Sequence, residues 1–337
     1  MNYQGKKILI IGGTGTLGQY LTRFLLEQDP HVIRILSRDE YKQYEMQRVF
    51  SDHQSRLRFL IGDVRDGQRL QRAMENIDYV FHLAAMKHVP FCEYNPFEAV
   101  QTNIIGTQNM IQAAIQCGVK KVLFTSTDKA ISPTNTYGAS KLMAERLISA
   151  AEYQKGPKQT VFASVRFGNV MGSRGSVIPL FRKQILEKRC ITVTDLNMTR
   201  YMMTATQAMS LMLKANELSR GGEVFVLKMP TIRLRDLVDV VIEEVCRKYG
   251  IKDRIEIQEV GLRPGEKRYE ELMTEEEKLL AWDHPEMYMI PSPFQEAAGV
   301  HPYPDATRVV CGEVNSHLEQ TIDRETLRDW ILTENLI

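Results

Sequence analysis

The chain contains 337 residues, of which 43% are hydrophobic and 25% are charged. These proportions exclude a disordered or fibrous chain, and the length is enough for one large or two average domains. The formal net charge of +1 gives no basic excess that would point to nucleic acid or an anionic membrane. We expect no signal peptide at the N-terminus. The sequence has no apolar run of the ~18 residues that a spanning helix needs. We therefore expect a cytoplasmic protein that binds neither nucleic acid nor a membrane.

The first 170 residues alternate between strand-like and helix-like segments. We expect strands at 7–13, 32–38, 57–63, 78–84, 120–127 and 160–167, and helices at 16–28, 39–50, 67–75, 96–117 and 137–153. Alternation at this spacing predicts a parallel sheet built from βαβ units. The strands are almost continuously apolar, which is typical of strands covered on both faces.

The rest of the chain has a different pattern. We expect helices at 178–188, 204–219, 234–249, 266–281 and 318–336, strands at 191–195, 222–228 and 255–260, and mainly loops at 283–312. The predicted fold class is α/β, a Rossmann-type doubly wound parallel sheet with a smaller, discontinuous α/β substrate domain. We assign residues 1–170 and about 204–228 to the NADP-binding Rossmann domain, and about 171–203 and 229–337 to the sugar-nucleotide-binding domain.

A glycine-rich loop follows the first predicted strand. The segment IIGGTGTLGQYL places Gly12, Gly15 and Gly18 between that strand and the first helix. Glycines at this spacing allow a sharp turn and a close approach of the backbone to a pyrophosphate at the helix N-terminus. In its βαβ context the loop predicts a dinucleotide site, with Thr16 and Leu17 also beside the cofactor.

The end of the second predicted strand bears on the choice of cofactor. The residues there are Ser37, Arg38 and Asp39. An acidic residue would bind the ribose 2′-hydroxyl of NAD, whereas an arginine can accept the 2′-phosphate of NADP. Because Ser37 and Arg38 come first, we predict NADP, with NAD as the alternative. Ligands of such sheets bind at the carboxyl ends of the strands. The further cofactor contacts expected on this basis are Asp63, Val64, Ala84 and Ala85.

Reactive side chains follow the fifth predicted strand. Tyr137 and Lys141 lie four residues apart at the start of a helix, and therefore on one face. An ammonium group beside a phenol lowers the pKa of the phenol, which then accepts a hydroxyl proton more readily. Asp128 and Lys129, directly after Thr127, supply a neighbouring acid and base. Lys129 acts as a base only while neutral, which requires desolvation or a nearby cation.

These motifs together resemble a known family. The chain contains GGTGTLG, LAAMKHVP, TNIIGT, STDKA, YGASK, RFGNVMGSRGSVIPLF and GLRPGEKRYEEL, which are similar to motifs of the extended short-chain dehydrogenase/reductase superfamily. STDKA followed by PTNTYGASK resembles the bacterial UDP-N-acetylglucosamine 4,6-dehydratases, over residues 5–280. Two departures are Ile11, where threonine is common, and Tyr137, where many membrane-attached relatives carry methionine.

The resemblance implies a reaction without net redox change. Hydride leaves C4 of the sugar for NADP with Tyr137 as base and Lys141 as its electrostatic partner. Lys129 then removes the C5 proton while Asp128 helps the C6 hydroxyl leave as water, and the hydride returns to C6. The product is a UDP-4-keto-6-deoxy sugar, and inversion at C5 stays open.

The resemblance also implies which residues hold the ligands. It adds Lys87, Asn103, Tyr137 and Lys141 to the cofactor contacts, and Thr127 to the catalytic group. The implied substrate contacts are Lys87, Asn169, Arg174, Val177, Pro179, Arg200, Arg263 and Glu266. The guanidinium groups among them suit a diphosphate, which they match bidentately. The resemblance further implies a homo-oligomer, and the scattered cysteines indicate no metal site.

Three alternatives stay open from the sequence. An NAD(P)-dependent sugar-nucleotide C4 epimerase needs Tyr137 and Lys141 but not the pair of Asp128 and Lys129. A 4,6-dehydratase that acts on GDP-N-acetylglucosamine would use the same chemistry on another nucleotide. A regulator that binds NADP without catalysis would need neither pair.

Overall fold

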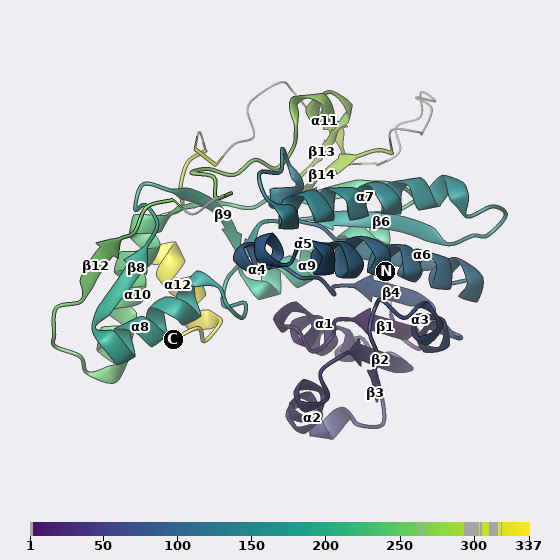
Figure 1. Cartoon of the computed structure of the whole chain (residues 1–337), viewed down its shortest axis with the longest axis horizontal. Coiled ribbons are helices and arrows are strands. Elements are labelled where there is room, and N and C mark those ends of the chain that lie inside the picture. Colours follow the sequence, from purple (N-terminus) through teal and green to yellow (C-terminus); the bar gives the residue numbers. More distant parts are fainter. Residues whose placement is uncertain (1–2, 263–264, 293–302, 304, 310–315, 318) are drawn as a thin grey trace.

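A ten-stranded sheet runs through the larger part of the molecule (Figure 1). The computed structural model describes residues 3–262, 265–292, 303, 305–309, 316–317 and 319–337. The strand order is β15-β13-β14-β10-β6-β5-β4-β1-β2-β3, and all neighbours from β3 to β10 are parallel. The arrangement of β1 to β6 is that of a doubly wound dinucleotide-binding sheet, so the predicted α/β class is confirmed.

The predicted βαβ units of the first 170 residues are present. The parallel strands are β1 (Lys7–Ile11), β2 (Val32–Ser37), β3 (Leu57–Ile61), β4 (Tyr79–His82), β5 (Lys121–Thr125), β6 (Val161–Arg166) and β10 (Val224–Leu227). The main helices beside them are α1 (Thr16–Leu26), α2 (Glu40–Val49), α3 (Gly67–Met74), α6 (Gly106–Cys117), α7 (Thr136–Gln154) and α9 (Ala205–Leu218).

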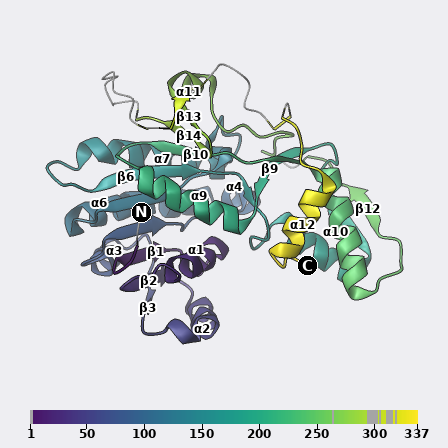
Figure 2. The same cartoon turned by 180° about the vertical axis from the view of Figure 1, so that it is seen from behind.

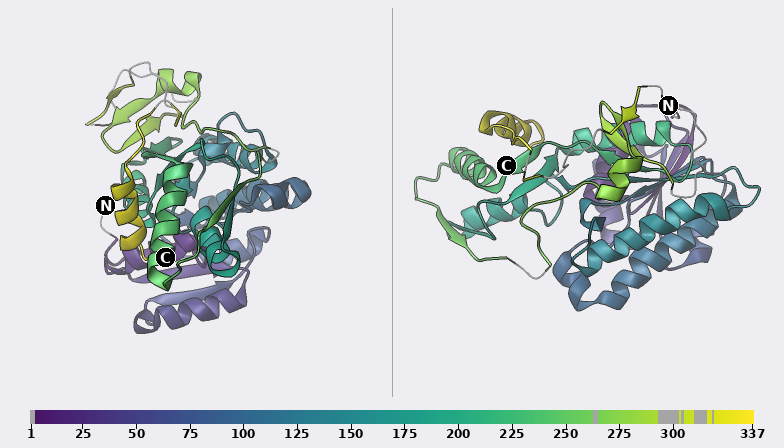
Figure 3. Two further views of the ribbon diagram at one scale, coloured as in Figure 1. Left: turned by 90° about the vertical axis from the view of Figure 1, so that its left-hand side faces the viewer. Right: turned by 90° about the horizontal axis from the view of Figure 1, so that it is seen from above.

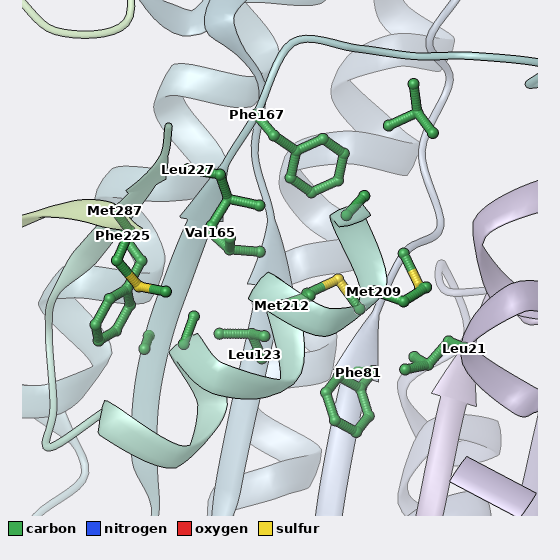
Figure 4. Close-up of a cluster of buried hydrophobic side chains, with 14 of the residues drawn as sticks. Leu21, Phe81, Leu123, Val165, Phe167, Met209, Met212, Phe225, Leu227 and Met287 are labelled. Carbon is green, nitrogen blue, oxygen red and sulfur yellow. The ribbon is translucent and has the colours of Figure 1, made fainter. Parts of the chain in front are cut away.

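Helices cover both faces of the parallel strands (Figures 1 and 2). In β1, Ile8 and Ile10 belong to one buried apolar cluster, whereas Leu9 and Ile11 belong to another. Successive side chains of a strand point to opposite faces, so a strand covered on both faces must be apolar throughout. Figure 4 shows the first cluster, in which α1 and α9 contribute Leu21, Met209 and Met212 against Phe81, Leu123 and Val165 of the strands.

A second group of elements lies beside one end of the sheet (Figures 1 and 3). It comprises β7 (Asn169–Val170), α8 (Val177–Lys188), β8 (Cys190–Val193), β9 (Thr199–Met203), β11 (Thr231–Arg233), α10 (Leu234–Tyr249), β12 (Glu256–Glu259) and α12 (Arg324–Thr333). Most of these elements share their own buried apolar cluster, which includes Phe181 of α8, Val241 of α10 and Ile331 of α12. This separate core supports our proposal that these segments form a smaller domain.

The segment 283–312, for which we predict mainly loops, contains β-strands. β13 (Trp282–His284), β14 (Met287–Ile290) and β15 (Thr307–Arg308) add antiparallel strands to the edge of the main sheet. This part of the chain therefore extends the large sheet, although it was assigned to the smaller domain. The strands are short, and β14 joins the sheet by pairing with β10, which is far away in the sequence, so no local signal predicted them.

The predicted helix at 266–281 is wrong for most of its length. Only α11 (Glu275–Leu280) is helical, and Thr274 caps it by accepting a hydrogen bond from the amide of Glu277 at 3.2 Å. Upstream, the Arg200 side chain donates to the carbonyl groups of Lys267 and Arg268 at 2.8 and 2.9 Å. Contacts of this kind hold the backbone in a non-helical path, which overrides local helix propensity.

The predicted helix at 96–117 is interrupted. It consists of α5 (Pro96–Ala99), a π-helical turn η2 (Val100–Ile105) and α6, and it follows a short helix, α4 (Val89–Tyr94). Such π-turns often occur at functional sites.

None of the helices in the described ranges has both the length and the apolar character needed to cross a membrane.

Candidate active site

A cavity of about 450 Å³ is lined by segments from the large sheet and from the second group of elements. This volume suits a small-molecule ligand. The sequence-predicted residues that line it are Lys87, Thr127, Asp128, Lys129, Tyr137, Asn169, Val177, Arg200 and Glu266. All the predicted catalytic residues except Lys141, and most of the implied substrate contacts, therefore line one cavity.

The glycine loop fits a dinucleotide. Gly12 has a φ of +82°, and a Cβ atom there would lie 2.7 Å from the amide nitrogen of Ala84. A Cβ atom on Gly18 would lie 2.4 Å from the carbonyl oxygen of Gly13. Helix α1 begins at Thr16 without a side-chain cap or an acidic residue in its first turn. Its first amide groups are therefore suited to bind phosphate.

Arg38 and Asp39 are placed differently at the end of β2. The Arg38 side chain is 58% exposed and lies 3.7 Å from Asp63. Asp39 instead caps α2, accepts a hydrogen bond from the amide of Lys42 at 3.0 Å and pairs with its ammonium group. Arg65, which the sequence reasoning missed, also binds Asp63, at 2.8 Å. Arg38 and Arg65 thus lie near the predicted ribose position, while the Asp39 carboxyl group caps α2.

Both ends of the Asn103 side-chain amide make hydrogen bonds within the protein. Its Oδ1 accepts a hydrogen bond from the amide of Met86 at 2.8 Å. Its Nδ2 donates to the carbonyl of Met86 and to the hydroxyl of Ser140, both at 2.9 Å. The buried amide is thus used on both sides for contacts within the protein, and its contact with the cofactor stays a prediction. Asn103 joins the loop after β4 to helix α7, which carries Tyr137.

Lys141 is buried beneath the site. Its Nζ donates to the carbonyl of Thr125 at 2.5 Å and lies 4.0 Å from the ring centroid of Phe124. Burial lowers the pKa of Lys141 to about 7, although Glu145 opposes this shift. Lys141 therefore anchors the start of α7 against β5.

Tyr137 takes its electrostatic support from the preceding loop. Burial raises the pKa of Tyr137, whereas a hydrogen bond with Thr127 and the ammonium group of Lys129 act to lower it. The sequence predicted this cationic role for Lys141. In the structure Lys129 has this role as well, because Lys129 and Tyr137 line the same cavity.

Asp128 and Lys129 form an ion pair in the cavity. They lie in the short helical turn η3 (Asp128–Ala130), and the Lys129 Nζ is 3.1 Å from Oδ2 of Asp128. Burial opposes both charges, but the Lys129 ammonium holds the pKa of Asp128 below its ordinary value. Asp128 and Glu270 likewise raise the pKa of Lys129 above its ordinary value. This ion-paired form is the reverse of the protonated acid and neutral base that elimination requires.

Glu270 is a site residue that the sequence reasoning missed. Its carboxyl group is buried in the cavity wall and lies 3.2 Å from the Lys129 Nζ. Asn169 donates to both carboxyl oxygens, at 3.1 and 3.0 Å. The motif RPGEKRYEEL contains Glu270. Because the sequence predicts a helix there, it gave no indication that this carboxyl group lines the cavity.

Three implied substrate contacts differ from the prediction or are not described. Arg174 lies against the glycine loop, where its amide donates to the Thr16 hydroxyl at 3.1 Å and its side chain donates to the carbonyl of Thr14. This contact places it beside the cofactor loop instead. Pro179 lies in α8 but not among the residues that line the cavity. Arg263 lies outside the described residues.

The sequence also matches a family of known proteins. The model of the family described as "Polysaccharide biosynthesis protein" matches residues 8–292. The chain belongs to this family.

Individual relatives agree with this assignment. Pen from Bacillus thuringiensis, known from an X-ray structure, is 55% identical with a TM-score of 0.94 over 100% of both chains. A Campylobacter jejuni protein named UDP-N-acetylglucosamine 4,6-dehydratase (inverting) is 43% identical over 86% of this chain and 83% of its own. A Rickettsia typhi protein named UDP-glucose 4-epimerase is also 43% identical, over 85% and 83%. The chain is therefore a sugar-nucleotide-modifying enzyme of the short-chain dehydrogenase/reductase type, and identity alone does not choose between dehydration and epimerisation.

Proposed function

We propose that this family member is an NADP-dependent UDP-N-acetylglucosamine 4,6-dehydratase. The observation that carries the proposal is the position of Asp128 and Lys129 beside Tyr137 in one cavity. Removal of water across C5 and C6 requires an acid and a base that act on neighbouring carbons. Epimerisation at C4 requires neither group.

The cofactor part of the proposal is supported by the glycine loop and by Arg38. Bound NADP would accept the hydride from C4 and return it to C6. Gly12 and the first turn of α1 would hold the pyrophosphate. The exposed guanidinium of Arg38 would bind the 2′-phosphate, since Asp39 is engaged in capping α2.

Tyr137 would accept the proton of the C4 hydroxyl group during oxidation. Burial holds the pKa of Tyr137 above its ordinary value, and its hydrogen bond with Thr127 and the nearby Lys129 ammonium act against that rise, toward the phenolate that this step needs. The Thr127 hydroxyl also donates to Asp128 Oδ1 at 2.8 Å. A chain of hydrogen bonds therefore connects the oxidation base with the elimination acid, and after elimination the proton gained by Tyr137 can pass along it to Asp128.

Elimination would begin with a proton transfer inside the ion pair. Lys129 gives a proton to Asp128, which converts the charged pair into a neutral amine and a carboxylic acid. Exclusion of water by the sugar favours this neutral form. Lys129 then takes the C5 proton, while Asp128 protonates the C6 hydroxyl. The C6–O bond breaks, water leaves, and the ion-paired form is restored. When the hydride returns to C6, C5 takes up one proton from the acid groups of the site, and the proton held on Tyr137 replaces it by way of Thr127 and Asp128.

A product analysis tests the proposal against the epimerase alternative. The protein is incubated with UDP-N-acetylglucosamine and NADP in deuterated water, and the product is examined by mass spectrometry and proton NMR. A 4-keto-6-deoxy product that has lost one water is expected, and its C5 signal also reports the configuration there. A C4 epimer that retains the hydroxyl group would refute the dehydratase.

Two variants test the assigned roles. Lys129→Ala and Asp128→Asn are expected to slow the loss of water at least ~100-fold. NADP binding, measured by fluorescence titration, is expected to stay nearly unchanged, because neither side chain belongs to the glycine loop. Full conversion to the dehydrated product by either variant would contradict these roles.

A further inference from the structure

The segment 173–177, which leads into α8, lies between the two predicted ligand sites. Four of its residues line the active-site cavity, namely Ser173, Gly175, Ser176 and Val177. Arg174 does not line the cavity and contacts the glycine loop instead. We propose that Arg174 couples the two sites, so that a bound dinucleotide and a bound nucleoside diphosphate each strengthen the binding of the other. The inference rests on the two nucleotide sites of the proposed function, but not on the reaction assigned to them.

Two hydrogen bonds join Arg174 to the glycine loop. Its backbone amide donates to the Thr16 hydroxyl at 3.1 Å, and its guanidinium donates to the carbonyl of Thr14. Thr16 is the first residue of α1, where the pyrophosphate of the proposed NADP would bind. The guanidinium is therefore held beside the expected position of an anionic group.

The positive charge of Arg174 is not balanced by an ion pair. Arg174 is exposed, and in the part of the chain that the structure describes it forms no salt bridge with a carboxyl group. Its charge acts on both sites. Hydrogen bonds with Lys42 lower the pKa of Asp39, and Arg174 lowers it further. Burial lowers the pKa of Lys87 in the cavity, and Arg174 again adds to the shift. A bound pyrophosphate would supply a counter-ion for this guanidinium.

The same segment forms part of the cavity wall. Gly175 has a φ of +75°, and a Cβ atom there would lie 2.5 Å from Cε1 of His88, which also lines the cavity. Ser176 is the N-cap residue of α8, and its buried hydroxyl has no hydrogen-bond partner among the described residues. The first turn of α8 contains no acidic residue. This end of α8, two residues from Arg174, is therefore suited to the phosphate groups of a nucleoside diphosphate.

The coupling requires a docked and a released position of segment 173–177. A ligand shifts such an equilibrium only if it binds one position better than the other. The dinucleotide favours the docked position, because its pyrophosphate attracts the Arg174 guanidinium. The nucleoside diphosphate favours it as well, because docking places Ser176 and the start of α8 in the cavity wall. Each ligand therefore strengthens the binding of the other by the same factor.

Calorimetric titration with UDP measures this coupling without any turnover. UDP lacks the hexose, so it gains no affinity from a contact between sugar and nicotinamide, and two anionic ligands would otherwise repel each other. Saturating NADP is expected to tighten the binding of UDP to the parent protein ~10-fold. Saturating UDP should tighten the binding of NADP by the same factor.

Two variants assign the coupling to the charge of Arg174. Arg174→Gln removes the charge but can still donate a hydrogen bond to the Thr14 carbonyl. It is expected to bind UDP alone as the parent does, but to lose the effect of NADP. Arg235→Ala is the matched control, because Arg235 is an exposed arginine of α10 that does not line the cavity. The control should keep the full coupling factor.

The outcomes separate this inference from the proposed function. A parent that binds UDP equally well with and without NADP overturns the inference, whatever the variants do. An Arg174→Gln variant that keeps the full factor also overturns it, because the charge would then not cause the coupling. If the coupling is present in the parent and lost in Arg174→Gln, but UDP-N-acetylglucosamine is not dehydrated, the proposed function is wrong and the inference stands. A parent that binds neither nucleotide refutes both.

Discussion

Replacing Arg166 with methionine is expected to lower the free energy of unfolding by about 3–5 kcal/mol. Arg166 ends β6, and its side chain is fully buried. It binds Glu145 of α7 at 2.6 Å and Glu277 of α11 at 2.9 Å, and it donates to the carbonyl of Leu272 at 3.0 Å. The guanidinium thus connects the sheet to the helix that carries Tyr137 and to the segment that carries Glu270.

The expected loss comes from the two carboxyl groups left behind. The side chain of Glu145 is 0% exposed and that of Glu277 is 10% exposed. Methionine fills much of the arginine volume, so the cavity cost is small, whereas both carboxylates lose the Arg166 guanidinium, and Glu277 keeps only Arg146 at 3.9 Å. The triple variant Arg166→Met, Glu145→Gln, Glu277→Gln removes those charges and is expected to recover most of the lost stability.

The loss is expected to depend on pH. Burial alone would raise the pKa of Glu277, but Arg166 holds it below the ordinary value of 4.5. A carboxyl group with a lowered pKa stabilises the fold above its unfolded pKa, and this contribution disappears as the pH falls through the folded value. The difference between parent and Arg166→Met should therefore be full at neutral pH and shrink as the pH falls below about 4.5.

Urea denaturation followed by circular dichroism measures this difference over a range of pH. Because the chain is large, the comparison requires that fluorescence and circular dichroism give the same transition. A loss below ~1 kcal/mol at neutral pH would refute the reasoning. So would a triple variant that is no more stable than Arg166→Met.

Four further predictions follow from the geometry. Gly12→Ala should lose NADP binding in a fluorescence titration. Gly118→Ala should keep it, because Gly118 has a similar positive φ but no neighbour within 4 Å of an added Cβ atom. Equal binding by both variants would show that the close contact between position 12 and Ala84 does not matter for the cofactor. Arg38→Ala should abolish the preference for NADP over NAD, and an unchanged ratio of affinities would exclude Arg38 from the site. The pKa of Lys141 is lowered to about 7, so its titration makes the free energy of unfolding rise between about pH 7 and 10.5. Lys141→Met should flatten that rise in denaturation measured at several pH values. If the free energy of unfolding of parent and variant depends on pH in the same way, the assignment is wrong. Tyr94 in α4 is 88% exposed, and Tyr94→Asp should lower the mass measured by light scattering if this face forms the predicted homo-oligomer; an unchanged oligomer would exclude that face.

The Rossmann sheet could be predicted because its signals are local. Gly12, Gly15 and Gly18 lie within one loop, and each strand is a short apolar run next to a periodic helix. The reactive loop was equally accessible, since Asp128, Lys129 and Tyr137 follow one strand and the carboxyl ends of such strands form the ligand site. These residues do line one cavity.

The parts that were missed depend on pairings across the chain. β14 is a strand because it pairs with β10, and residues 265–274 are not helical because Arg200 and Asn169 bind them from other segments. The Glu270 carboxyl group reaches Lys129 across 141 positions of sequence. A local pattern contains no information about a contact at that separation.

The sequence by itself determined which chemical groups are present and the loop that brings a phenol, an acid and a base together. Only the tertiary structure decided their pKa values: that of Lys129 is raised, that of Asp128 is lowered, and that of Lys141 is lowered to about 7. The reason is that a pKa depends on burial and on the distance to other charges. Both quantities are defined only when distant segments have packed against one another.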